Sequence, residues 1–251
     1  MSIHRFHVPP AEVRGNEFAL PAAEAHHAIK VLRCRVGDPV QVLDGCGRTM
    51  SCEIIDVSRR EVRVRTREVR SVGEPSVRVI LFQAITKGKS FDLILEKATE
   101  IGVSEIVPVI CERAVAVPDG KQALAKAEKW RHTAIAALKQ SGRAWLPVTH
   151  PVTPFFSAVS RSEKCDWKMV AALDPTARPL KDWLRGVGGL LSAGSTIAVW
   201  IGPEGDFTES EYHVMRSRGF SFATLGDAVL RAETAAICAL ACIRYEVGDR
   251  A

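Results

Sequence analysis

From residue 77 onwards, apolar runs of strand length alternate with stretches that have helical periodicity. Strands are predicted at residues 77–85, 105–110, 168–173, 196–201 and 220–225, and helices at 91–101, 124–140, 208–218 and 231–245. This alternation predicts an α/β unit with a mostly parallel sheet covered by helices on both faces. Ligands of such sheets bind at the carboxyl ends of the strands.

Two of these predicted strand ends carry glycine. One strand runs into Ile201-Gly-Pro-Glu-Gly205, and the last strand runs into Leu225-Gly-Asp-Ala-Val-Leu-Arg-Ala-Glu-Thr-Ala235. Glycine lets the chain turn tightly and brings bare backbone amides close to a ligand. The two runs therefore predict two loops that hold a small molecule of nucleoside type.

The first part of the chain has a different pattern, with short β-type runs at residues 3–8, 18–20, 39–44, 49–57 and 61–70 and one predicted helix at 21–33. Glycine-containing turns separate several of the runs, which is typical of a small barrel or a curled antiparallel sheet. Turn formers cluster at Ser71-Val-Gly-Glu-Pro75. We therefore expect two domains, residues 1–72 and residues 73–251.

Composition limits the class of protein. The 251 residues are 47% hydrophobic and carry a formal charge of +5, which permits an anionic partner without requiring one. Without a membrane-length apolar run or the apolar segment of a signal peptide, the chain is expected to be cytoplasmic. Its seven cysteines include no C-x-x-C pair, which argues against a disulfide framework and a zinc site. Arginines alternate with apolar residues at 61–67, which fits either a solvated strand face or a phosphate-binding face.

The common nucleotide and catalytic fingerprints are missing or incomplete. No G-x-G-x-x-G spacing occurs, and Gly186-Val-Gly-Gly189 is interpreted as a plain loop. Lys87-Gly-Lys-Ser90 resembles the end of a Walker A loop, but Gln83 occupies the position of its first glycine. Two lysines beside a helix N-terminus can still bind phosphate. Glu96 and Glu100 share a helix face, where a neighbouring lysine and solvent explain them without acid–base chemistry.

A further set of motifs follows a fixed order along the chain. They are Arg5-Phe-His-Val-Pro9, Lys87-Gly-Lys-Ser90 with Glu96-Lys-Ala-Thr-Glu-Ile-Gly-Val103, Cys111-Glu-Arg113, Trp130 through Gln140-Ser-Gly-Arg143, and the two glycine runs. Together they resemble the RsmE-type ribosomal RNA uridine-N3 methyltransferases of the SPOUT superfamily. The resemblance spans nearly the whole chain.

The resemblance implies a PUA-like RNA-binding β-barrel domain followed by a SPOUT methyltransferase domain with a C-terminal trefoil knot. It further implies S-adenosyl-L-methionine as cofactor, a homodimer, and methylation of N3 of one uridine in 16S rRNA of the small ribosomal subunit. No metal is implied, since the sulfonium is already an activated leaving group. A non-catalytic RNA-binding protein and a P-loop phosphotransferase that uses ATP and magnesium are the alternatives.

The resemblance also assigns residues to roles. Cofactor-binding residues are expected to be Leu173, Ile201, Gly202, Pro203, Glu204, Gly205, Leu225, Gly226, Val229, Leu230, Thr234 and Ala235. We interpret Arg231 and Arg5 as catalytic candidates that would stabilise a uracil anion. The other interpretation of Arg231 is a residue that braces the knot, and that of Arg5 is a surface strand arginine. Glu233 is an alternative proton acceptor, or a first-turn carboxylate that only satisfies the helix dipole. RNA contacts are expected at Lys30, Arg33, Lys87, Lys89, Gln140 and Arg143. Two positions depart from the family pattern: Asp206 stands where glycine usually repeats, and Ala228 where a basic residue is common.

Overall fold

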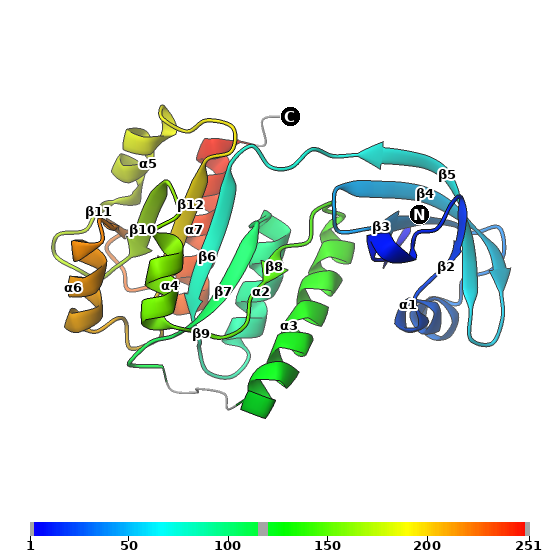
Figure 1. Ribbon diagram of the computed structural model, residues 1–251, viewed down its shortest axis with the longest axis horizontal. Helices are drawn as coiled ribbons and strands as arrows, with labels where there is room; N and C mark the ends of the chain where they lie inside the picture. The colour runs from blue at the N-terminus through cyan, green and yellow to red at the C-terminus, as the bar shows by residue number, and fades with distance from the viewer. Residues whose placement is uncertain (1–2, 115–119, 249–251) are drawn as a thin grey trace. The chain divides into compact units, whose positions relative to one another are not determined.

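The structure of the protein, a computed structural model, describes residues 3–114 and 120–248. It divides into two compact units, which Figure 1 shows as ribbons. The N-terminal unit contains residues 1–74 and 135–146, and the C-terminal unit contains residues 75–134 and 147–251. Helix α3 (Gly120–Ser141) therefore contributes its last residues to the N-terminal unit.

The N-terminal unit is built on a five-stranded sheet with the strand order β1-β3-β4-β5-β2. Its strands are β1 (His4–His7), β2 (Glu17–Ala19), β3 (Pro39–Leu43), β4 (Arg48–Val57) and β5 (Val62–Ser71). The pairings are antiparallel except that of β1 with β3, which is parallel. The prediction of a curled antiparallel sheet is wrong for this pair. The long connection between β1 and β3, which includes β2 and a helix, permits the crossover that a parallel pair needs.

The predicted helix at residues 21–33 is present in two parts. α1 (Ala22–His26) continues into a π-helical segment, η2 (His27–Leu32), and a short 3-10 turn, η1 (Pro10–Glu12), precedes β2. Arg33 ends the helix in the left-handed conformation, with φ 54°.

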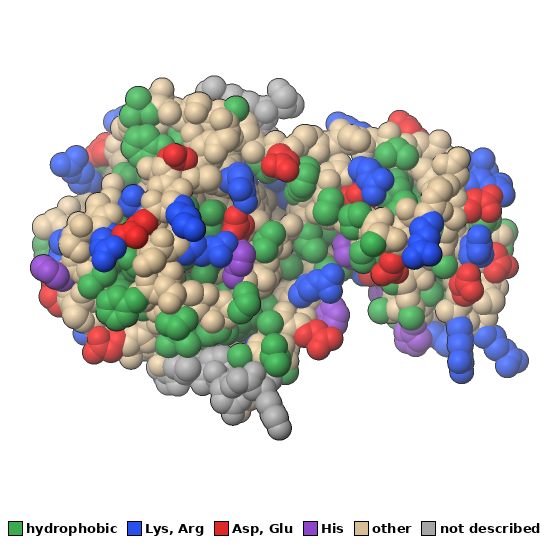
Figure 2. Space-filling model, viewed as in Figure 1, with side chains coloured by type: hydrophobic (Ala, Val, Ile, Leu, Met, Phe, Trp, Pro, Cys, Tyr) green, Lys and Arg blue, Asp and Glu red, His purple; other side chains and the backbone are tan. Residues whose placement is uncertain are grey.

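The valines at 62 and 64 in β5 are buried while its arginines are exposed, as expected of a half-buried strand. Two of the arginines have carboxylate partners on neighbouring strands: Arg65 pairs with Glu17 at 2.7 Å, and Arg67 pairs with Glu53 at 2.5 Å. Figure 2 likewise shows acidic side chains interspersed with the basic ones. These ion pairs favour a solvated strand face over a phosphate-binding face.

The C-terminal unit is built on an eight-stranded sheet in which each pairing of its strands is parallel. The strand order is β11-β13-β10-β12-β6-β7-β8, and β9 pairs with β7. The strands are β6 (Arg78–Ala84), β7 (Glu105–Ile110), β8 (Val148–Thr149), β9 (Thr153–Pro154), β10 (Trp167–Ala171), β11 (Arg178–Pro179), β12 (Thr196–Ile201) and β13 (Ser221–Thr224). The predicted parallel sheet is confirmed.

Helices cover both faces of this sheet (Figure 1). Buried side chains of α2 (Ser90–Ile101), α5 (Leu180–Gly188) and α7 (Ala232–Val247) pack in one apolar cluster. Those of α4 (Phe155–Ser162) and α6 (Glu209–Ser217) pack in a second cluster with the opposite side chains of the strands. The two-faced burial explains why these strands are continuous apolar runs in the sequence.

Two helices, α4 and α5, were not predicted. The interpretation of residues 186–189 as a plain loop is wrong for Gly186 to Gly188, which form the end of α5. The apolar spacing of Leu180, Trp183, Leu184 and Val187 is helical, and these side chains are buried. The glycines that follow obscured this signal because glycine disfavours helix interiors.

The predicted helix ends are confirmed at two places. Gly102 terminates α2 in the left-handed conformation, with φ 91°. At the start of α6, Thr208 accepts a hydrogen bond from the backbone of Glu211, whose carboxylate accepts one from the backbone of Thr208. This capping box satisfies amides that a helix N-terminus leaves free.

A charged cluster surrounds Glu105, near the amino end of β7. The buried carboxylate of Glu105 contacts Arg78 at 2.5 Å, Arg161 at 2.7 Å and the Nε2 atom of His150 at 2.8 Å. The hydrogen bond with His150, together with Arg161, lowers the pKa of Glu105 from 4.5 to about 2 against the opposing effect of burial. The ionised carboxylate is therefore bound more favourably in the folded chain than in the unfolded one.

We expect Glu105→Gln to lower the free energy of unfolding at neutral pH by roughly 2–3 kcal/mol. Because the folded-state pKa of Glu105 is depressed, its contribution is complete above about 4.5 and is lost as the pH falls toward about 2. Urea unfolding across this range should show wild type and variant converging in acid. Glu61→Gln, at an exposed ion pair, is the matched control. A difference that did not change with pH would contradict this account of Glu105.

Within the described residues, no helix is both long and apolar enough to cross a membrane. The same part of the chain holds no group of three or more histidine, cysteine or acidic side chains placed to bind a metal ion. The cysteines are free, and Cys34, Cys52, Cys111 and Cys165 are buried.

Candidate functional site

A cavity of about 640 Å³ lies at the carboxyl ends of the strands of the C-terminal unit. Its walls come from the segments that follow β6, β10, β12 and β13, the last of which leads into the first turn of α7. The lining residues are 87–90, 171–173, 201–204, 206, 224–226, 228–233 and 235. Small-molecule sites have volumes of about 300–1,000 Å³, so the cavity has the size of such a site.

The structure brings the two predicted glycine loops together around this cavity. The predicted cofactor residues that line it are Leu173, Ile201, Gly202, Pro203, Glu204, Leu225, Gly226, Val229, Leu230 and Ala235. Gly205 and Thr234 belong to the same loops but lie outside the lining. Residues that the sequence reasoning did not assign include Ala171, Ala172 and Thr224, whose only signal is that they stand at predicted strand ends.

Gly202 lies where side chains crowd the backbone. A Cβ atom at this position would come within 3.0 Å of the Asp206 Oδ1 atom and within 3.3 Å of the Phe207 ring. Gly202 itself is buried. Any larger residue at position 202 would therefore force Asp206, Phe207 or the loop itself to shift.

Contacts from other segments fix the loop after β12. The backbone amide of Lys87 donates to the Glu204 carboxylate at 2.9 Å. Arg113 donates to the backbone carbonyl of Gly205 at 2.8 Å. These contacts tie the loop to the segments that follow β6 and β7.

The cavity is lined by charges of both signs. Lys87, Lys89 and Arg231 supply positive charge, and their side chains make no hydrogen bond or ion pair with any residue that the structure describes. Arg231 is exposed and precedes the first turn of α7 as its N-cap residue. These cations remain available to an anionic ligand.

Comparison with known proteins decides the family. The RNA methyltransferase domain family matches residues 73–244. The chain belongs to this RNA methyltransferase family. The PUA domain family of RNA methyltransferases matches residues 20–66, within the N-terminal unit.

Two curated relatives of the methyltransferase are both named ribosomal RNA small subunit methyltransferase E. The protein from Bacillus subtilis is 29% identical over 230 residues, which cover 91% of this chain and 90% of the relative. The protein from Synechocystis is 30% identical over 244 residues, which cover 95% of this chain and 76% of the relative.

Two solved structures share the fold and contain S-adenosylmethionine. A methyltransferase from Legionella pneumophila, in complex with this cofactor, has a TM-score of 0.88 and 28% identity over 98% of each chain. A ribosomal RNA small subunit methyltransferase E from Neisseria gonorrhoeae, bound to S-adenosylmethionine, has a TM-score of 0.85 and 26% identity over 100% of each chain. The predicted SPOUT-type core with a small N-terminal β domain is thus confirmed, and the trefoil knot stays a prediction.

Arg5 of the methyltransferase lies in the N-terminal unit, where its guanidinium is already engaged. It donates to Gln41 at 3.0 Å and to the backbone carbonyls of Lys139 and Gln140 at 3.1 and 2.8 Å. A Cβ atom at Gly142 would come within 2.9 Å of the guanidinium. The contacts favour the structural interpretation of Arg5, because carbonyls at a helix C-terminus attract a cation.

We expect Arg5→Met to destabilise the protein by about 1–3 kcal/mol, since it leaves carbonyls at the end of α3 without their donor. Thermal unfolding measures the loss, and Arg14→Met, at an exposed arginine of the same unit, is the control. If Arg5→Met abolished methyl transfer without changing stability, the catalytic interpretation of Arg5 would be restored.

The predicted RNA contacts are divided between the two units. Lys87 and Lys89 line the cavity. In the N-terminal unit, Lys30, Arg33 and Gln140 are exposed and Arg143 is half-buried. Their role in RNA binding stays a prediction.

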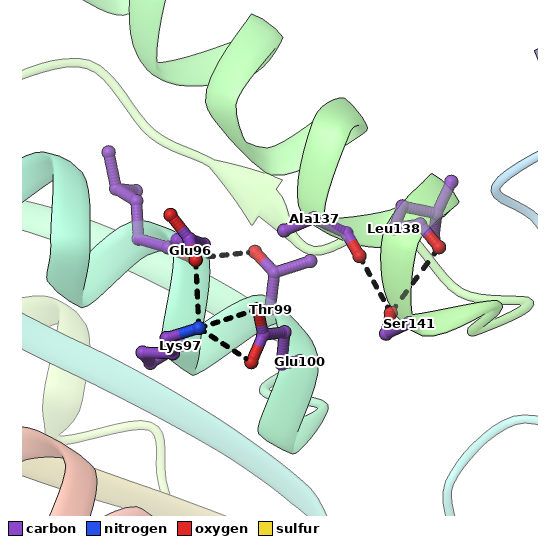
Figure 3. A network of polar contacts seen from close by, with 8 residues as sticks. Glu96, Lys97, Thr99, Glu100, Ala137, Leu138 and Ser141 are labelled. Atoms are coloured by element: carbon purple, nitrogen blue, oxygen red, sulfur yellow. Dashed lines mark hydrogen bonds and ion pairs between the residues drawn. The ribbon is translucent and has the colours of Figure 1, made fainter.

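Glu96 and Glu100 belong to a local network on α2 (Figure 3). Lys97 donates to Glu96 at 2.8 Å and to Glu100 at 2.9 Å. Both carboxylates raise the pKa of Lys97 through hydrogen bonds. These contacts agree with the prediction that Glu96 and Glu100 are explained by their neighbouring lysine and are not a catalytic acid–base pair.

Proposed function

We propose that the protein uses S-adenosylmethionine to methylate N3 of one uridine in the 16S rRNA of the small ribosomal subunit. The main observation behind the proposal is that the two glycine loops, at the carboxyl ends of β12 and β13, line the same cavity. The names of the relatives support a ribosomal RNA substrate, and the Legionella and Neisseria complexes support the cofactor.

The residues present fit this cofactor. The volume of about 640 Å³ accommodates a nucleoside with an amino-acid tail. Backbone groups around Gly202 and Gly226 would hold its polar edges, and the aliphatic side chains of Leu173, Val229 and Leu230 would cover its apolar parts. When bound, S-adenosylmethionine supplies a methyl group already activated by a sulfonium centre.

Arg231 is proposed to stabilise the negative charge that forms on uracil when N3 loses its proton. Arg231 lines the cavity, and among the described residues its guanidinium has no partner that would neutralise it. A cation beside a developing anion lowers the barrier because it stabilises the negative charge that forms in the transition state.

Glu233 is proposed to accept the proton from N3. Three acidic residues line the cavity, and two of them already accept hydrogen bonds: Glu204 from the Lys87 amide and Asp206 from the Tyr212 hydroxyl. Glu233 has no such partner within the described residues. Transfer of the N3 proton to this carboxylate leaves the uracil anion near Arg231, ready for attack on the methyl group.

The proposal extends to the organisation of the protein. Residues 1–72 would form the PUA-like RNA-binding domain and residues 73–251 the SPOUT methyltransferase domain, which the two family matches support. The predicted contacts in both units would bind RNA phosphates. We also propose that the protein is a cytoplasmic homodimer, and sedimentation at several protein concentrations tests the dimer.

The deciding experiment incubates the protein with labelled S-adenosylmethionine and small subunits that lack the modification. The expected product is 3-methyluridine at one position, found by nucleoside analysis of the 16S rRNA. RNA binding without transfer would favour the non-catalytic alternative. Magnesium-dependent ATP turnover without methyl transfer would favour the phosphotransferase. Naked 16S rRNA in a parallel reaction shows whether the assembled subunit is required.

A further inference from the structure

Asp206 has a backbone conformation that most side chains avoid. Its φ is 58°, and among the described residues only Arg33 is also a non-glycine residue with positive φ. Left-handed backbone is unfavourable for most L-residues, although aspartate tolerates it better than most. Asp206 also lines the cavity, so this conformation shapes the wall where the cofactor is proposed to bind.

The Asp206 side chain is held by a buried tyrosine on α6. The Tyr212 hydroxyl lies 2.7 Å from each oxygen of the Asp206 carboxylate. The Tyr212 ring packs against Phe207 and Phe222, with centroid distances of 5.6 and 5.3 Å, and is 5% exposed. Because the ring is enclosed, the hydroxyl has a fixed position.

The Asp206 carboxylate in turn lies against the first glycine of the same loop. A Cβ atom at Gly202 would come within 3.0 Å of the Asp206 Oδ1 atom. Gly202 and Asp206 both line the cavity. One side chain from α6 therefore fixes a carboxylate that packs against the loop after β12.

We propose that Tyr212 and Asp206 are positioning residues that hold the loop after β12 in its cofactor-binding conformation. Glycine at position 206 would adopt the same backbone conformation at no steric cost. The loop could then also adopt other conformations. The hydrogen bond from Tyr212 to Asp206 holds the loop in one conformation. The loop therefore loses less conformational entropy when the ligand binds. This inference rests on the proposed binding of S-adenosylmethionine in the cavity.

The Tyr212 hydroxyl keeps its proton at neutral pH. Burial, the hydrogen bond to Asp206 and the Asp206 charge all raise the pKa of Tyr212, while the Leu173 amide opposes them. Tyr212 therefore remains a hydrogen-bond donor to a carboxylate. Such charge-assisted bonds are stronger than neutral ones.

The test is a double-mutant cycle on the full chain, with S-adenosylmethionine affinity measured by calorimetry. We expect Tyr212→Phe and Asp206→Gly each to weaken binding about tenfold, equivalent to about 1.4 kcal/mol. The double variant should be no weaker than Asp206→Gly alone, because both substitutions remove one interaction. Asp206→Asn should retain most of the affinity, since its amide oxygen accepts the hydrogen bond and asparagine tolerates positive φ.

Tyr245→Phe is the matched control, because Tyr245 is the only other tyrosine in the chain and is 89% exposed. A merely structural role for Tyr212 would lower the melting temperature of ligand-free protein and leave the affinity of folded protein unchanged, which would overturn the proposal. The proposal would also be overturned if the loss of affinity in the double variant equalled the product of the losses in the two single variants. If wild type itself failed to bind S-adenosylmethionine, the proposed function would fall as well, and that outcome is visible before any variant is made.

Discussion

Gly202→Val is expected to weaken S-adenosylmethionine binding at least a hundredfold, or about 2.7 kcal/mol. The first atom of the new side chain would approach the Asp206 carboxylate to 3.0 Å and the Phe207 ring to 3.3 Å. The two methyl groups of valine need still more room, so the loop after β12 must move. Because this loop forms a cavity wall, its movement alters the site even though the new side chain points toward Asp206 and Phe207.

Gly189→Val separates this effect from the general cost of replacing glycine. A Cβ atom at Gly189 would meet no other atom within 4 Å, and its φ of −74° is open to any residue. Calorimetric titration with S-adenosylmethionine should give wild-type affinity for Gly189→Val. Overpacking at Gly202 also costs about 1–3 kcal/mol of stability, so circular dichroism must show that the variant is folded during the titration. A folded Gly202→Val protein with unchanged affinity would refute the assignment of the cavity.

Five strands of the C-terminal unit, β6, β7, β10, β12 and β13, could be predicted from the sequence because their side chains are buried on both faces of the sheet. Val79, Leu81 and Val199 pack on one side of the sheet while Phe82 and Trp200 pack on the other. Such strands form unbroken apolar runs that local patterns reveal. The short strands β8, β9 and β11 have exposed residues and give no such apolar run. The parallel pairing of β1 with β3 could not be predicted in this way, because it depends on residues far apart in the chain.

The candidate site shows the same division between local and distant information. The glycine loops could be located because each motif is a short continuous stretch. The hydrogen bonds from the Arg5 guanidinium to the carbonyls of Lys139 and Gln140 could not be predicted from the sequence. These partners lie 134 and 135 residues from Arg5 along the chain. Asp206 was recognised as a departure from the family pattern, but its explanation required Tyr212, whose hydroxyl reaches it only after α6 has folded.

Arg231→Ala is expected to reduce the rate of methyl transfer by a factor of about 100–1,000 while leaving the affinity for S-adenosylmethionine within about threefold of wild type. Arg231 lines the cavity and its guanidinium has no partner in the described part of the chain, so its removal disturbs no hydrogen bond there. The loss should therefore fall on kcat with small subunits as substrate, because the charge it stabilises appears only during the reaction. Single-turnover transfer with labelled cofactor measures this step directly.

Arg231→Lys and Arg185→Ala complete this experiment. Lysine keeps the charge and should restore part of the rate, since a cation near the uracil is the main requirement and the planar geometry of arginine the lesser one. Arg185 is exposed on α5 and lies outside the cavity lining, so Arg185→Ala should transfer methyl groups at the wild-type rate. A raised KM for the small subunit with unchanged kcat in Arg231→Ala would mean that Arg231 binds the RNA backbone. In that case its charge acts in the ground state, and Glu233 would have to be tested alone as the residue that makes N3 reactive.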